Sequence, residues 1–479
     1  MFNFRWLTRL ALAVGMVGAL VAAPSVDGSR LFKGAEAMSV QNVPGTFVSA
    51  ITVLNPSTSP GPANIVVDFY DPSGVKVTTV TNPPVAPGGT AFWYVPNITG
   101  LTANQTYSAV VSADQQVYAT VNLSTLAGTT PIMGETYNGV DSAAVVTSAA
   151  APSVLRNYYG FTSNVVVQNT GTAAANVSVT VAGSGSTGAI NFTTTPQNVA
   201  SNASFTLDLA TLSNLGDNFN GAATVNGSSN NVAVISNNYT PTTSSSVPNY
   251  LFSSTNGVPA GASSTIAYVP GLYKYYYGFF TALIVQNVDT APANVVVTYQ
   301  TGATDTFSNL APGTSHVFFT PSNGSLPSGF IGSATVSTTN GKQILAQVNV
   351  QGTPGTTSGV GLASYSGFTN GTTSVFAPGL VKNYYTFNSS LTIQNVDTTT
   401  APAGSITITY SNGASHTNAQ PLGPGASLLL YTPNEPGIPD KFNGGATVVS
   451  TGGQKIVGLI NLSGVNTADQ LFSTNAFGK

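Results

Sequence analysis

A segment of fourteen residues recurs along the chain and limits its fold more than any other feature. It reads RNYYGFTSNVVVQN at 156–169, KYYYGFFTALIVQN at 274–287 and KNYYTFNSSLTIQN at 382–395. A weaker copy, NVPGTFVSAITVLN at 42–55, keeps only the phenylalanine, the apolar run and the final asparagine. Recurrence at intervals of about 110 residues predicts four tandem structural units.

Two further sequence motifs that recur later in the units indicate where each unit ends. An asparagine recurs in TVNL, ISNN, QVNV and LINL, at Asn122, Asn237, Asn349 and Asn461. The closing segment YLFSSTNGV at 250–258 is echoed by QLFSTNAFG at 470–478. We therefore expect repeats at 33–140, 141–258, 259–371 and 372–479, of which the first is degenerate.

Within each repeat the pattern is typical of β-strands. Runs such as NVVVTYQ and QILAQVNV are short, rich in Val, Ile, Thr and aromatic residues, and separated by Gly, Pro and Asn turns. About seven strands in a repeat of this size predict an antiparallel β-sandwich. The repeats resemble the tandem immunoglobulin-like modules of bacterial and archaeal cell-surface proteins of the S-layer and adhesin type. That resemblance implies an all-β chain of four Ig-like sandwiches.

The N-terminus predicts export. Two arginines at positions 5 and 9 precede an apolar run at 10–21 and small residues at 22–24. This order is typical of a secretory signal peptide, here residues 1–24, and an uncleaved membrane anchor is the alternative. The rest of the chain has no second hydrophobic span, so we expect no transmembrane segment after cleavage. An extracellular or cell-surface location follows from this prediction.

The composition argues against several classes of function. Only 6% of the residues are charged, against about 25% in ordinary soluble proteins, and the net charge is -3. Nucleic-acid binding through a basic surface is therefore not expected. The two histidines, His316 and His416, lie in different repeats, and no nucleophile, phosphate-binding or zinc motif is present. We predict no enzymatic activity, no cofactor and no metal; calcium near Asp68 and Asp71, or a hydrolase site assembled from distant loops, are the weaker alternatives.

Paired tyrosines in the repeated segment allow two interpretations. If the segment is a strand, adjacent rings point to opposite faces. The rings could bury apolar surface at junctions between repeats while their hydroxyl groups stay exposed to water, or they could stack on sugar rings as a glycan-binding patch. We favour the junction. The candidate residues are Tyr158, Tyr159, Tyr276, Tyr277, Tyr384 and Tyr385.

A cation also recurs in the segment, as Arg156, Lys274 and Lys382, which are three of the twelve Lys and Arg residues. Where it is lysine, an aspartate follows fifteen residues later, so lysine and acid occur together. One interpretation is a Lys–Asp salt bridge between neighbouring strands. The other is a spontaneous Lys–Asn isopeptide bond, as in some Ig-like modules of surface proteins, where a buried acid relays protons. The matching residues would be Lys274, Asp289 and Asn349, and Lys382, Asp397 and Asn461.

These features together favour a non-enzymatic structural or adhesive protein outside the cell, such as an S-layer, sheath, fibre or matrix component. Its expected partners are further copies of itself or components of the cell envelope. The alternative is an array of carbohydrate- or surface-binding modules that contact polysaccharide through the tyrosines, with avidity from repetition.

Overall fold

The computed structural model describes residues 8–14 and 46–479 apart from short gaps at 72–74, 104, 106, 128–129, 142–145, 172, 202, 230, 244–249, 353–360, 465–468, 470 and 479. Across these residues the fold is all-β and every strand pairing between named strands is antiparallel. The predicted all-β class is therefore confirmed. Among the described residues, no helix has the length and apolar character that crossing a bilayer requires.

Each repeat consists of two layers, and we call the sheet that carries the closing strand the inner sheet and the other the outer sheet. The inner sheet of the first repeat has the order β5 (Thr90–Tyr94), β2 (Thr46–Leu54), β7 (Tyr118–Ala127), β8 (Thr130–Asn138). Its outer sheet has the order β4 (Lys76–Thr81), β3 (Ile65–Tyr70), β6 (Tyr107–Ala113), β1 (Thr8–Val14), β9 (Val140–Asp141).

The second and fourth repeats have the same order of strands. The inner sheet of the second is β15 (Ser204–Asp208), β11 (Thr162–Asn169), β17 (Val232–Tyr239), β18 (Phe252–Asn256). Its outer sheet is β13 (Gly188–Thr193), β12 (Ala175–Gly185), β16 (Phe219–Asn226), β10 (Ser148–Arg156), β19 (Val258–Pro259), with β14 (Gln197–Val199) on β12. In the fourth repeat the inner sheet is β32 (Ser427–Tyr431), β29 (Phe387–Asn395), β34 (Ile456–Gly464), β35 (Leu471–Asn475), and the outer sheet is β31 (Ser415–Thr417), β30 (Ile406–Tyr410), β33 (Phe442–Ser450), β28 (Ser374–Lys382), β36 (Phe477–Gly478).

In the third repeat the two layers are joined through a hairpin into one eight-stranded sheet. Its order is β23 (Thr304–Leu310), β22 (Ala293–Tyr299), β25 (Phe330–Thr338), β20 (Ile266–Tyr276), β21 (Phe279–Asn287), β26 (Ile344–Gly352), β27 (Leu362–Ser366), with β24 (Ser315–Phe319) on β21. The described helices are single 3-10 turns: η1 (Val95–Asn97), η2 (Leu209–Thr211), η3 (Ser213–Leu215), η4 (Ala260–Ala262), η5 (Thr320–Ser322) and η6 (Thr432–Asn434).

Apolar residues from both layers form the cores. In the third repeat, Val269 and Leu272 of β20 and Leu283 and Val285 of β21 belong to one buried cluster. Comparable clusters fill the second and fourth repeats. The first repeat's cluster continues into the second repeat and includes Phe252 of β18, so these two repeats share a core. Burial of this kind is the main favourable term for each sandwich-like unit.

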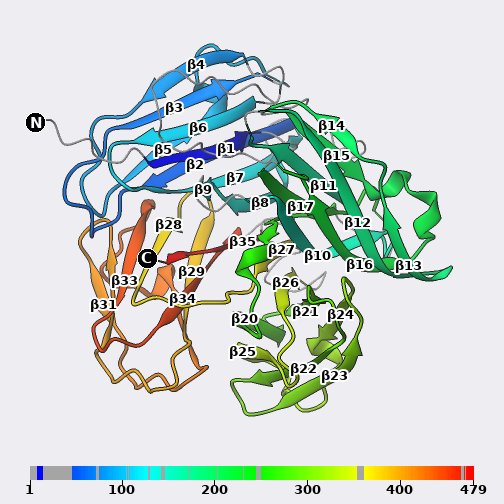
Figure 1. Cartoon of the computed structure of the whole chain (residues 1–479). Helices are drawn as coiled ribbons and strands as arrows, with labels where there is room; N and C mark the ends of the chain where they lie inside the picture. The colour runs from blue at the N-terminus through cyan, green and yellow to red at the C-terminus, as the bar shows by residue number, and fades with distance from the viewer. Residues whose placement is uncertain are drawn as a thin grey trace, which may run out of the picture.

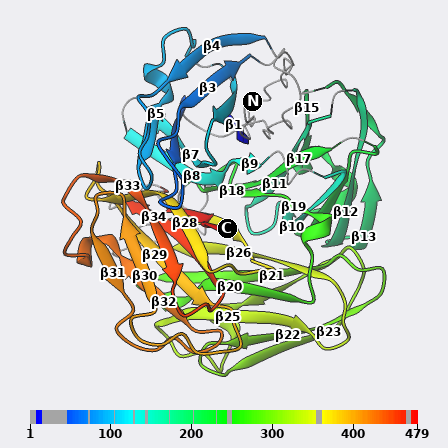
Figure 2. The same cartoon turned by 60° about the vertical axis from the view of Figure 1, so that its left-hand side comes forward.

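The four repeats close into a ring around the closing strands. Figures 1 and 2 show four lobes about one centre, where the labels of several closing strands also lie. Strand β18 contacts β8 and β27, and β35 contacts β27 and β8, so each closing strand touches the next one around the ring. The repeat spacing predicted tandem units but did not indicate this closure.

The repeated asparagine at the end of the fourteen-residue segment has a structural role. Asn55, Asn169, Asn287 and Asn395 are all fully buried. In the third repeat, Asn287 Nδ2 donates to the carbonyl oxygens of Ala291 and Leu310, at 2.9 and 2.8 Å, and thereby joins two turns. Asn395 repeats both bonds in the fourth repeat, with Thr399 and Leu422. This part of the motif is therefore repeated because each sandwich needs it.

Candidate binding site

Each tyrosine pair lies at the tip of a tight hairpin in the three complete copies, and the second tyrosine lies in the turn, not on a strand as predicted. Tyr159, Tyr277 and Tyr385 have φ values of 49°, 47° and 45°, in the left-handed region. Such a backbone is unfavourable for a bulky side chain, at a cost of about 1–3 kcal/mol per residue. The second tyrosine therefore turns outward instead of pointing to the far face of a sheet, and this corrects the predicted alternation.

The two rings of each pair contact each other in the same way in all three copies. The rings of Tyr276 and Tyr277 meet edge to face, with centroids 4.8 Å apart and an interplanar angle of 86°. The pairs at 158–159 and 384–385 have the same separation and angles of 86° and 84°. Nevertheless, the outer rings of Tyr159, Tyr277 and Tyr385 remain 75%, 68% and 81% exposed. The same unfavourable backbone conformation thus recurs in all three hairpins, and in each it carries an exposed tyrosine.

The hairpin of the second repeat borders a groove of about 550 Å³ at the junction with the third repeat. Tyr158 and Tyr159 line it from one repeat, and Phe280 and Phe319 from the other. Amide side chains supply polar atoms, and none of the described residues that line the groove carries a charge. The amides are those of Asn220, Asn238, Asn349 and Gln351.

The hairpin of the third repeat borders an equivalent groove, of about 1130 Å³, at the junction with the fourth repeat. Tyr276 and Tyr277 line it from the third repeat, and Tyr431, the counterpart of Phe319 at the end of β32, lines it from the fourth. Amides again line the groove, from Gln300, Asn418, Gln420, Asn434 and Asn461. In these two copies the tyrosine pair therefore lies at a junction between repeats and also borders an open groove.

The larger groove also contains a contact between a histidine and a glutamate that sequence reasoning missed. His416 Nδ1 lies 3.1 Å from Glu435 Oε2, and the glutamate is largely buried. Lys382 Nζ donates to the carbonyl oxygen of the same Glu435, at 3.1 Å. Nineteen residues separate His416 from Glu435 in the sequence, so only the fold brings the two side chains together.

The repeated cation binds backbone carbonyls, which corrects the predicted Lys–Asp salt bridge. Lys274 Nζ donates to the carbonyl oxygens of Asn323 and Leu326 in the turn after η5. Arg156 donates to the carbonyl oxygen of Gly216 and pairs with Asp217, each at 2.8 Å. A cation at this position thus satisfies carbonyl groups of the loop that borders the tyrosine hairpin.

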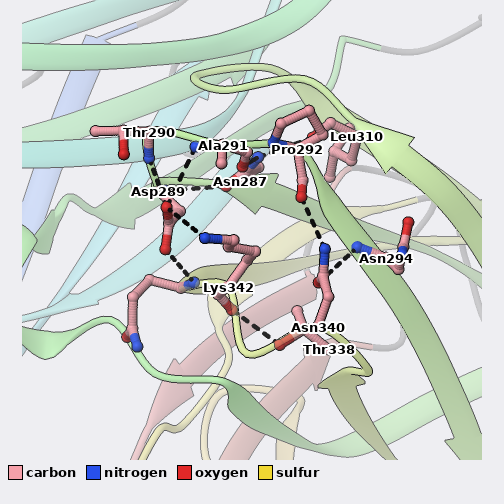
Figure 3. A network of polar contacts seen from close by, with 11 residues as sticks. Asn287, Asp289, Thr290, Ala291, Pro292, Asn294, Leu310, Thr338, Asn340 and Lys342 are labelled. Carbon is pink, nitrogen blue, oxygen red and sulfur yellow. Dashed lines mark hydrogen bonds and ion pairs between the residues drawn. The ribbon is translucent and has the colours of Figure 1, made fainter.

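The aspartates of the QNVD segments lie far from these lysines. Asp289 follows the far end of β21, and nine strand residues at about 3.3 Å each place it roughly 30 Å from the hairpin. There it accepts the backbone N–H of Gln343 and pairs with Lys342, 3.6 Å away (Figure 3). Hydrogen bonds from backbone N–H groups, that of Gln343 first, hold the pKa of Asp289 below its usual value. Asp397 likewise accepts the N–H of Thr399 and of Lys455.

The asparagines proposed for isopeptide bonds have other partners. Asn349 Oδ1 accepts a hydrogen bond from Ser364 at 2.9 Å, and Asn461 Oδ1 accepts one from Ser473. Asn461 Nδ2 donates to the Tyr273 hydroxyl across the junction. The structure therefore brings together neither Lys274, Asp289 and Asn349 nor Lys382, Asp397 and Asn461. Each asparagine instead links its penultimate strand to the closing strand.

Two buried carboxyl groups at the centre of the ring were also missed. Asp469 accepts the backbone N–H groups of Phe252 and Leu362, at 2.7 and 2.9 Å, and its own N–H donates to the carbonyl oxygen of Ile132. Asp469 belongs to the fourth repeat and therefore forms hydrogen bonds with each of the other three repeats. Glu135 of β8 is fully buried, and burial raises its pKa well above the ordinary value. Neither acid has a counterpart in the other repeats, so the repeat pattern did not reveal them.

At the other end of the closing strands, polar side chains join all four repeats in a closed circuit. Asn256 Nδ2 donates to the Asn138 carbonyl oxygen at 3.1 Å, and Asn138 Nδ2 donates to that of Asn475 at 2.7 Å. Asn475 Nδ2 donates to the Ser366 carbonyl oxygen at 2.7 Å, and the Ser366 hydroxyl donates to that of Asn256 at 3.4 Å. These residues occupy the same position in the four closing segments, so the ring has approximate fourfold symmetry.

No group of three or more metal-ligating side chains is found among the residues that the structure describes. No protein-family model matches this chain, and no curated protein matches it. Nine chains of solved structures match. One, described as the crystal structure of Thermotoga maritima 1070, is 11% identical, covers 29% of this chain and 96% of that chain, and has a TM-score of 0.18. A Streptomyces avermitilis α-L-rhamnosidase complexed with L-rhamnose is 10% identical, covers 76% of this chain and 47% of that chain, and has a TM-score of 0.12.

Proposed function

We propose that this chain is an exported, non-enzymatic structural or adhesive protein of the cell surface, built from Ig-like sandwiches. The leader-like N-terminus supports export, and the low charge lets neighbouring molecules pack with little repulsion. The closed ring, joined at its centre by Asp469 and by the Asn138 circuit, supports a rigid building block more than a flexible string of modules.

Localisation in intact cells tests this proposal. Cell fractionation and electron microscopy with an antibody against the protein are expected to place it in an ordered layer, sheath or fibre on the cell surface. A monomer that accumulates in the culture medium, with no assembly at high concentration and no attachment to cells, would contradict it.

We further propose that the tyrosine hairpins bind neutral polysaccharide. The observation that carries this second proposal is the exposed tyrosine held at positive φ beside an uncharged groove, as at Tyr159. A fold that needed only a tight turn would use glycine there, because glycine adopts this backbone without strain. Unfavourable backbone at an exposed ring therefore favours a role in binding.

The groove chemistry suits a sugar. The C–H face of a pyranose ring stacks on an aromatic ring, and amide side chains both donate to and accept from hydroxyl groups. A charged ligand would find no countercharge among the described residues that line the smaller groove. Several weak sites on one rigid ring would bind a long polymer through avidity.

Replacement of the outer tyrosines by glycine separates binding from folding. In the triple variant Tyr159→Gly, Tyr277→Gly and Tyr385→Gly, we expect pull-down on insoluble neutral polysaccharides to fall at least tenfold. The thermal midpoint should be unchanged or higher, because glycine relieves the left-handed strain. The double variant Asn157→Gly and Asn383→Gly is the matched control: both residues have positive φ in the same hairpins but carry no ring, so binding should be retained.

Two results would count against polysaccharide binding. One is a wild-type protein that binds none of a panel of neutral glucans, chitin and mannans. The other is a triple variant that unfolds at a clearly lower temperature, because the rings would then serve the fold and not a ligand.

A further inference from the structure

Strand β1 fills a defined slot in the outer sheet of the first repeat. It lies between β6 and β9, where Ala11 is paired with both Val110 and Val140. In the second repeat β10 fills the same slot between β16 and β19, and Ala150 is paired with both Thr224 and Val258. The fourth repeat places β28 between β33 and β36.

The source of the slot strand differs in the first repeat. In the second, β10 ends at Arg156 and the first inner strand begins at Thr162, and in the fourth β28 ends at Lys382 and β29 begins at Phe387. Each slot strand there comes directly before the first inner strand. In the first repeat, β1 ends at residue 14 and β2 begins only at residue 46. Moreover, β1 belongs to the segment that the sequence predicts to be removed on export.

We propose that in the exported protein residues 34–42 replace β1 in the slot between β6 and β9. This inference rests on the proposed export, because cleavage after about residue 24 removes β1. Without a replacement, β6 would lose its partner on one side and leave a row of unpaired N–H and C=O groups at a sheet edge. An open edge of that kind pairs with whatever strand can reach it.

The sequence of this segment fits the slot. The repeated motif aligns residue 42 with residue 156, so GAEAMSVQN at 34–42 aligns with SAAAPSVLR at 148–156. Four of the nine positions are identical. Three of these four positions in the second repeat, Ala149, Ala151 and Val154, are buried core residues of β10. Their counterparts are Ala35, Ala37 and Val40, so the segment carries small apolar residues where the core requires them.

The register of strand pairing supports the same placement of residues 34–42. Carried over from β10, the alignment pairs residue 36 with both Val110 and Val140, which are the two partners that Ala11 has in β1. The remaining connection, residues 43–45, has nearly the length of those in the second and fourth repeats. A segment held this close has a high effective concentration at the slot, which favours it over the same segment of a second copy.

Disulfide trapping tests the exchange, since the natural chain contains no cysteine. The variant Glu36→Cys with Val110→Cys is exported from its host, and its intact mass shows whether the leader is gone. Under mild oxidation with diamide we expect a bond within one chain in most molecules. The control Glu36→Cys with Val111→Cys is shifted by one residue, which places the second thiol on the other face of β6, and should form little or no bond.

The other outcomes separate this inference from the proposed export. A chain that lacks its leader but forms no bond at 36–110, or forms one only between two chains, overturns the inference and leaves export standing. A chain that retains its leader and forms the bond in the variant Ala11→Cys with Val110→Cys overturns both. Hydrogen exchange of the unaltered exported protein gives a second readout: the β6 amides that face the slot should be protected. If these amides exchange rapidly while those paired with β3 stay protected, the slot is empty.

Discussion

Asp469 offers the sharpest test of ring closure, because one side chain joins the fourth repeat to the others. Its carboxylate accepts the N–H groups of Phe252 and Leu362, and the residue is fully buried. In Asp469→Ala both donors lose their partner inside the protein. An unsatisfied buried donor costs about 1–3 kcal/mol, so the free energy of unfolding should fall by about 2–6 kcal/mol. Asp469→Asn keeps one acceptor oxygen and should lose about half as much.

Urea denaturation measures the loss, and small-angle scattering at low urea should show an expanded ring in Asp469→Ala. Asp440→Ala is the control, since this exposed carboxylate accepts a hydrogen bond from the Asn383 side chain at the surface. We expect a change below about 1 kcal/mol there. If Asp469→Ala is no more destabilising than Asp440→Ala, the closed ring does not depend on this residue and the reasoning is wrong.

Three further outcomes follow from the geometry. Burial raises the pKa of Glu135 above the value of about 4.3 in the unfolded chain, so its contribution to stability is present at low pH and lost as the pH rises. The thermal unfolding midpoint should therefore decrease as the pH is raised above about 4, and Glu135→Gln should make this decrease smaller. Gly134→Ala should cost about 1–3 kcal/mol in urea denaturation, because an added Cβ would lie 2.2 Å from the Phe472 ring. The intact mass of the exported protein should show no loss of ammonia, and such a loss would restore the bond between Lys274 and Asn349 that the structure argues against.

The all-β class could be predicted because its signal is local. Alternating apolar residues between Gly, Pro and Asn turns specify strands wherever they occur. Turn residues were equally informative: the sequence has APG at 86–88 and 311–313 and GPG at 423–425, and the final glycine of each has positive φ. Repetition also identified residues with a shared role, such as Asn287 and its counterparts, without showing what that role is.

The partners of the repeated residues could not be predicted, because they depend on the third dimension. Lys274 and Asp289 occur together in the sequence, but a full strand separates them in space. The tyrosine hairpin was mistaken for a strand because Tyr277 at positive φ breaks the usual preference of its residue type. Predictions from local residue preferences fail most often at strained functional sites. The failure at the tyrosine hairpin is therefore itself a reason to consider it a binding site.

Ring closure also explains why the interior of the assembly is so polar. In a separate sandwich the closing strand would be an exposed edge, and the Asn–Ser pairs that link it to its neighbour would face water. In the ring these pairs are buried, as with Ser254 and Asn237, or Ser473 and Asn461. Buried polar groups specify one arrangement, because any other leaves them unsatisfied. The repeated asparagine therefore fixes how four closing strands meet, and the two acids found in single repeats mark where the ring departs from fourfold symmetry.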